Sequence, residues 1–150
     1  MTLILFACIG FIAAILWVDL IFDALVLPHR GKDKPLPEEV LSTMSHFFRR
    51  ITHRPRLIFV VMIAIVYVII RQIVEASVPA WVGWTSLILF LTTAIFASIH
   101  IMPTARRFGS RGDEVTKQSE LAHSLFFLHA FSLAMIVLLG IVQLYAAWGS

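Results

Sequence analysis

The stretch TLILFACIGFIAAILWVDLIFDALVL, residues 2–27, decides the fold of this protein. Asp19 and Asp23 are its only charged side chains. A helix crosses the hydrocarbon core of a bilayer with about 20 mostly apolar residues. The stretch is too long for the apolar region of a signal peptide, and no basic residue precedes it. We therefore expect a retained first membrane-spanning helix.

The composition extends this interpretation to the whole chain. Of 150 residues, 59% are hydrophobic and 14% are charged, whereas an ordinary soluble domain has roughly 25% charged residues. Three further apolar runs predict spans at 57–74, 79–102 and 121–148. Together with the first span they leave only loops that are too short for a separate soluble domain. We predict an all-α integral membrane four-helix bundle, with residues 1–150 forming one four-span transmembrane domain.

The basic residues predict the orientation of this bundle. Loop 28–56 carries seven of the 12 Lys and Arg residues, and loop 103–120 carries four. Because cytoplasmic loops are enriched in Lys and Arg, we expect both loops in the cytoplasm and both termini outside, in a bacterial inner membrane. The lipid bilayer is then the expected partner. The basic loops carry no nucleic-acid-binding motif, so no nucleic-acid partner is predicted.

A short amphipathic helix is predicted inside the first loop. Pro37 is followed by Glu38 and Glu39, a pattern typical of a helix start. Apolar residues then recur every three or four positions as far as Ile51. We expect this helix to lie along the cytoplasmic membrane surface, with Pro55 separating it from the second span.

The two carboxylates of the first span mark a candidate site. Counted at 1.5 Å per residue from the predicted span end, Asp23 lies about 6 Å and Asp19 about 12 Å inside the membrane. Four residues apart, they share one helix face. A charged side chain at mid-membrane costs roughly 2.5–3.5 kcal/mol on insertion scales, so such residues usually have a function or a partner.

Two histidines are predicted to face these carboxylates. His100 ends a polar stripe of the third span that includes Ser86 and Thr93, and His129 lies on the polar stripe of the fourth span. By depth, Asp23 and His100 fall in a shallow layer, and Asp19 and His129 in a deeper one. His123 is about 120° away from His129 around its helix and is expected outside the site.

Several chemistries fit the resulting set, which comprises Asp19, Asp23, His100 and His129. Two carboxylates and two imidazoles can bind iron, manganese or zinc, and the two histidines can hold haem. Adjacent buried acids with a histidine can also relay protons. The same groups can simply tie helices together by hydrogen bonds. No catalytic motif is present, so neither catalytic residues nor a reaction is assigned.

The order of these features resembles a known group of membrane proteins. The run from Trp17 to Arg30, the run FRRITHRP at 48–55, the following basic loop and the closing span are similar to the HemJ-type protoporphyrinogen oxidases and the CopD copper-resistance proteins. The resemblance implies a haem-binding four-helix protein. Where HemJ-type members carry a histidine in the first span and a histidine and lysine in the third, this chain has Gly10, Gly83 and Thr85.

The sequence thus predicts a small inner-membrane protein whose Asp/His site binds a metal ion or haem. Two alternatives remain open. One is a non-catalytic accessory subunit of a larger membrane complex, and the partner is then that complex or, for a chain that works without one, a homo-oligomer. The other is a component of a proton relay.

Overall fold

The computed structural model describes residues 2–29, 35–52 and 56–148 and contains helices only in these ranges. Helix α1 (Thr2–Asp23) continues into η1 (Ala24–His29), and α2 (Glu38–Ile51) precedes α3 (Arg56–Val74). Helix α4 (Ala80–Phe96) continues through the π-helical turn η2 (Ala97–Ile101) into α5 (Met102–Ser110). Helix α6 (Val115–Trp148) ends the described chain. The all-α fold is as predicted.

Four helical segments are long and apolar enough to cross a membrane, namely Thr2–His29, Arg56–Val74, Ala80–Ser110 and Val115–Trp148. The third extends beyond its predicted end at Met102, and the fourth begins before its predicted start at Leu121. The extra turns contain charged residues such as Arg106 and Lys117. The predicted ends are where the sequence becomes polar. The helices continue past these points because the polar turns keep the helical hydrogen bonding.

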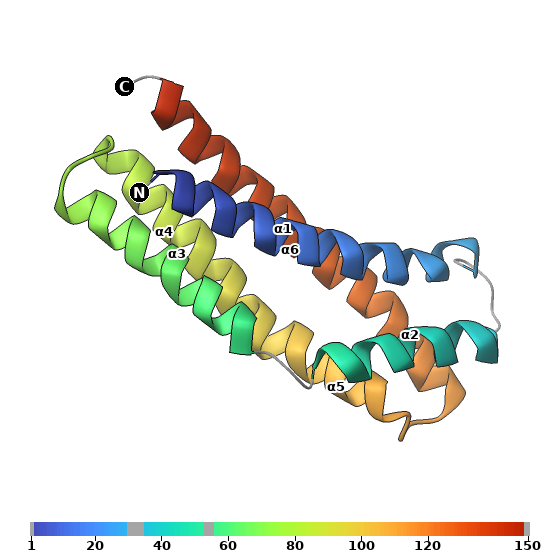
Figure 1. The fold of residues 1–150 in the computed structure, drawn as a ribbon. Coiled ribbons are helices and arrows are strands. Elements are labelled where there is room, and N and C mark those ends of the chain that lie inside the picture. The colour runs from blue at the N-terminus through green and yellow to red at the C-terminus, as the bar shows by residue number, and fades with distance from the viewer. Residues whose placement is uncertain (1, 30–34, 53–55, 149–150) are drawn as a thin grey trace.

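The spans pack as a four-helix bundle, in which α1 contacts α3 and α6, and α4 contacts the same two helices (Figure 1). Apolar side chains from all four fill its centre: Leu5, Ile9, Ile12, Ile65, Val68, Ile69, Phe90, Ile136 and Leu139. At 34 residues, α6 is about 50 Å long. It therefore extends well beyond a hydrocarbon core of about 30 Å.

A second apolar cluster lies at the opposite end of the bundle from the two described ends, Thr2 and Trp148 (Figure 1). It joins η1, α2, α5 and the first part of α6 through Val26, Leu36, Leu41, Met44, Phe48, Ala105, Phe108, Ala122 and Leu125. The predicted short helix is thus present as α2 and packs along α5. Its close approach requires Gly109, where an added Cβ would lie 3.2 Å from the backbone nitrogen of Arg49.

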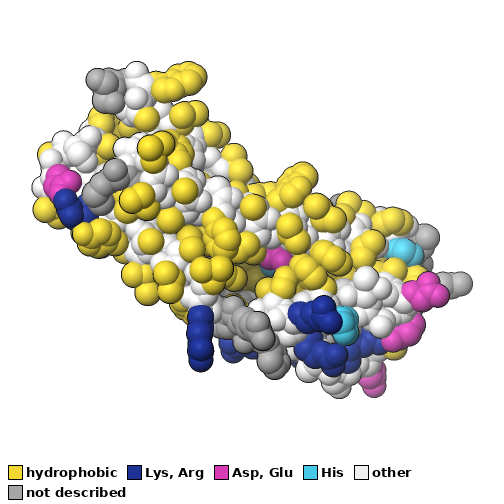
Figure 2. Space-filling model, in the orientation of Figure 1, with side chains coloured by type: hydrophobic (Ala, Val, Ile, Leu, Met, Phe, Trp, Pro, Cys, Tyr) yellow, Lys and Arg dark blue, Asp and Glu magenta, His cyan; other side chains and the backbone are white. Residues whose placement is uncertain are grey.

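The surface separates apolar from charged regions. Large apolar side chains are exposed on every span, for example Trp17 on α1, Phe59 on α3 and Ile99 on η2. Figure 2 shows Lys, Arg, Asp and Glu side chains gathered over the part of the molecule that carries α2 and α5. This distribution fits a multi-pass membrane protein with one strongly charged end.

A buried polar cluster joins α3, α4 and α6 in the half of the bundle that lies away from α2 and α5. The side-chain amides of Gln72 on α3 and Gln143 on α6 donate to each other at 3.1 Å, and Gln143 also donates to Ser86 Oγ on α4 at 2.8 Å. All three residues are buried. Interhelical hydrogen bonds of this kind hold membrane helices in register.

Candidate functional site

One histidine of α6 lies between the two carboxylates of α1. His129 Nδ1 is 2.5 Å from Asp23 Oδ2, and His129 Nε2 is 3.9 Å from Asp19 Oδ2. The contact between His129 and Asp23 is a short hydrogen bond. The second distance is too long for a direct hydrogen bond, and one water molecule could bridge it. The spacing of four residues places both carboxylates on the α1 face that packs against α6.

The three residues are almost completely removed from solvent. The exposed fraction is 7% for Asp19, 0% for Asp23 and 2% for His129. Phe48 of α2 stacks on the His129 ring, with ring centroids 5.8 Å apart and planes 8° from parallel. The His129 ring is therefore held by the hydrogen bond to Asp23 at its edge and by the Phe48 ring of α2 against its face.

The structure does not bring His100 to these residues. The His100 side chain is exposed, and its ring packs on Phe96 with centroids 5.0 Å apart. Ser86 and Thr93, the other members of its predicted stripe, are buried. The predicted shallow layer of Asp23 with His100 is thus replaced by a contact between Asp23 and His129.

The π-helical turn explains this difference. In η2 the amide of Met102 donates to the carbonyl of Ala97, five residues back instead of four. Pro103 follows at once; it has no N–H to donate, and its ring clashes with the carbonyl four residues earlier in a regular helix. One extra residue in a turn rotates the helix face by about 100°. The predicted polar stripe was counted along a regular α-helix, so it places Ser86 and Thr93 correctly on the buried face but not His100.

An inner cavity of about 140 Å³ adjoins the histidine. Its polar lining comes from Asp19, His129, Ser132, Thr93 and Thr52, and the rest of its wall is mostly apolar. Ser132 is fully buried, and among the described residues its hydroxyl has no hydrogen-bond partner. Apolar cavities stay dry, so water in this cavity would be held only at the edge formed by these few polar groups.

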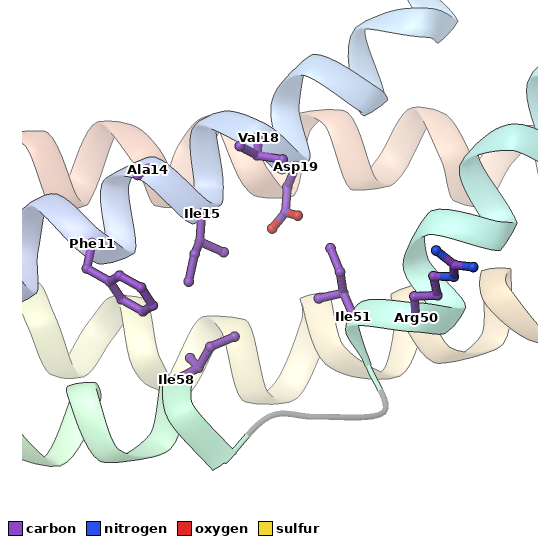
Figure 3. A pocket seen from close by; sticks show the side chains of 8 residues that line it. All are labelled: Phe11, Ala14, Ile15, Val18, Asp19, Arg50, Ile51 and Ile58. Atoms are coloured by element: carbon purple, nitrogen blue, oxygen red, sulfur yellow. The ribbon is translucent and has the colours of Figure 1, made fainter.

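A hollow of about 400 Å³ leads from the flank of the bundle to the same carboxylate. We call it the flank opening; it is lined by Phe11, Ala14, Ile15, Val18, Asp19, Arg50, Ile51 and Ile58. Figure 3 shows Asp19 pointing from α1 into the space between the end of α2 and the start of α3. The flank opening and the inner cavity share Ile15, Asp19, Ile51 and Ile58, and Asp19 is the polar side chain of this shared wall.

The arrangement suits proton exchange. With Asp23 accepting the proton of His129 Nδ1, the nitrogen that can accept a further proton is Nε2, which faces Asp19 and the inner cavity. A proton moving from Asp19 to Nε2 would produce an imidazolium in contact with the Asp23 carboxylate. Counted from two carboxylates and a neutral imidazole, the three groups are electrically neutral only after they take up two further protons.

The same geometry bears on metal binding. Asp19 and Asp23 approach different nitrogens of one ring, and His100 lies elsewhere. Among the described residues, no group of three or more His, Cys, Asp or Glu side chains is placed to hold a metal ion. A metal or haem at His129, or at His100, remains a prediction.

Two contributors to the site were not assigned to it from the sequence. Phe48 was one of several apolar residues on an amphipathic helix, and nothing in its spacing distinguishes the residue that stacks on His129. Thr52 lines the inner cavity from the residue that follows α2. By contrast, His123 lies outside the site as predicted, with Nδ1 2.8 Å from the carbonyl of Ser119.

Comparison with known protein families, curated proteins and solved structures finds no match to this chain. The resemblance to the HemJ and CopD proteins therefore stays a prediction.

Proposed function

We propose that this protein exchanges protons within the membrane at the Asp19–His129–Asp23 centre. The observation that carries the proposal is the position of one imidazole between two carboxylates, at 2.5 Å and 3.9 Å. An imidazole can accept a proton at one nitrogen and release one at the other. Ionisable groups inside a membrane are costly, and proton relays are one of the functions that use them.

The surroundings support this role. Asp19 reaches both the flank opening and the inner cavity, so it can receive a proton from a donor in either space. Asp23 is fully buried and contacts His129, so it would stabilise the charge that His129 acquires. Phe48 and the apolar wall limit access of bulk water to the ring.

We further propose that the charged end carrying α2 and α5 faces the cytoplasm of a bacterial cell, since basic loops favour that side. A relay unit of this size could serve a larger membrane complex, so the accessory-subunit role is compatible with the proposal.

One observation favours a metal ion as a second candidate. A histidine that binds a metal through Nε2 usually donates its other N–H to a carboxylate, and Asp23 lies in that position. Asp19 would then be the second protein ligand, and the cavity wall also carries the Ser132 hydroxyl, which has no hydrogen-bond partner among the described residues. Metal analysis of the purified protein separates this candidate from proton exchange alone.

Proton flux into vesicles tests the proposal. The protein is reconstituted in liposomes that enclose a pH-sensitive dye, and the internal pH is followed after an acid pulse outside. We expect faster acidification than in protein-free vesicles, and Asp19→Asn and His129→Gln should each reduce the protein-dependent rate at least tenfold.

Asp113→Asn is the matched control, because Asp113 lies in the loop between α5 and α6 and pairs with Arg107. It should leave the rate unchanged. A wild-type rate equal to that of protein-free vesicles, or equal rates for wild type and His129→Gln, would contradict the proposal.

A further inference from the structure

A groove of about 380 Å³ lies between the C-terminal ends of α2 and α5. It is lined by Arg49, Thr52, Arg106, Gly109 and Ser110, of which only Thr52 also lines the inner cavity beside the Asp–His centre. We call it the arginine groove. We propose that it binds the phosphate of an anionic phospholipid headgroup.

The two arginines of the groove, unlike Arg107 and Arg111, have no partner among the described residues. Arg107 donates to Asp113, and Arg111 pairs with Glu38. Within the described ranges, the guanidinium groups of Arg49 and Arg106 form no ion pair or hydrogen bond. The nearby carboxylates of Asp113 and Glu38 are paired with Arg107 and Arg111 instead. The groove therefore concentrates positive charge that the protein itself leaves uncompensated.

The backbone brings these two charges together. Gly109 allows α5 to approach Arg49, because a side chain there would press on the Arg49 backbone. Arg49 and Arg106 thus line one groove from two different helices. The hydroxyls of Thr52 and Ser110 donate to the carbonyls of Phe48 and Arg107, so the guanidinium groups supply the donors for a phosphate.

The position of the groove favours a lipid over a soluble anion. Ile99 lies seven residues before Arg106, about 10 Å along the helix, and is 60% exposed. Leu57, five residues after Thr52, is also 60% exposed. A phosphate held by the arginines would lie at the edge of an apolar surface that suits acyl chains. Anionic headgroups are attracted to basic residues at this level of a membrane.

Lipid titration of the full-length protein tests the inference. Binding of phosphatidylglycerol and of phosphatidylcholine to detergent-solubilised protein is measured by native mass spectrometry. We expect preferential binding of phosphatidylglycerol, and Arg49→Gln and Arg106→Gln should each weaken it about fivefold, given roughly 1 kcal/mol per basic residue. The paired neighbours provide the matched control: Arg107→Gln changes the net charge equally and should leave binding within twofold of wild type.

The outcomes separate the possible ligands. Equal losses for Arg106→Gln and Arg107→Gln would show attraction to net charge alone and overturn a defined site. Competition by inorganic phosphate at concentrations comparable to the lipid would assign the groove to a soluble anion instead. Helicity and thermal midpoint without added lipid identify a variant that is merely misfolded, and Arg49→Lys with Arg106→Lys should then retain part of the binding.

Discussion

His129 Nδ1 lies 2.5 Å from Asp23 Oδ2, and this contact joins the last span to the first across 106 positions of sequence. Neither group can be exposed to water without opening the bundle, since their exposed fractions are 2% and 0%. The contact therefore contributes both to the packing of α1 against α6 and to the chemistry of the site.

Removing either partner should destabilise the protein. Asp23→Asn and His129→Gln each disturb a buried charge-assisted hydrogen bond, and each leaves a buried polar group without its closest partner. A double-mutant cycle in detergent unfolding should give a coupling free energy of about 0.5–3 kcal/mol. The same cycle with Asp19→Asn should give a smaller coupling, because Asp19 is 3.9 Å from the ring. Additive effects for Asp23 and His129 would mean that the contact does not exist.

The glutamine cluster should affect stability but not proton exchange. Gln143→Ala leaves the buried amide of Gln72 and the hydroxyl of Ser86 without their partner, at a cost of about 1–3 kcal/mol. Gln72→Leu combined with Gln143→Leu replaces the pair by apolar groups and should cost less than the single change. Unfolding free energies and the vesicle assay check this together. A loss of proton flux in a folded double variant would place these residues in the proton path.

The ion pair between Arg107 and Asp113 should make the stability of the folded protein depend on pH in the acidic range below about 4. Two hydrogen bonds from Arg107 hold the pKa of Asp113 below its ordinary value of 3.8. A carboxyl whose pKa is lowered by folding stabilises the folded state above its unfolded pKa. That contribution is lost as the pH falls through 3.8 toward the folded pKa. Thermal midpoints of wild type and Asp113→Asn should therefore converge as the pH drops below this range. A difference that persists unchanged would argue against the pair.

Orientation can be measured with single cysteines introduced after Cys8→Ala. We expect Gly112→Cys, between α5 and α6, to resist an impermeant thiol reagent in intact cells, and Ser77→Cys, between α3 and α4, to react with it. Permeabilised cells provide the control, since both positions should then be labelled. The reverse pattern in intact cells would place the basic end outside.

The sequence was sufficient for the spans, the short helix and the burial of Asp19, Asp23 and His129, because each depends on a local pattern of apolar and polar residues. It was insufficient for His100. Pro103 was visible, but whether a proline kinks, ends or widens a helix depends on the neighbouring helices. The π-helical turn that changes the direction of His100 could therefore not be read from spacing.

Pairings between helices were also beyond the sequence. Depth counted from predicted span ends placed His129 level with Asp19, whereas the closer contact is with Asp23. The difference is one turn of helix, and the uncertainty of span ends is similar. The stacking of Phe48 depends on how α2 docks onto α6, which no local pattern records.

The central claim is that Asp19, His129 and Asp23 hold and release protons as one unit, and infrared titration of the carboxyl groups tests it most directly. In wild-type protein in lipid, a carboxylic acid C=O band should change with pH, and Asp19→Asn should remove part of it. His129→Gln should move the pH at which the remaining carboxyl band changes, because the imidazole contacts Asp23 and faces Asp19. A carboxyl band that titrates identically in wild type and His129→Gln would contradict the account.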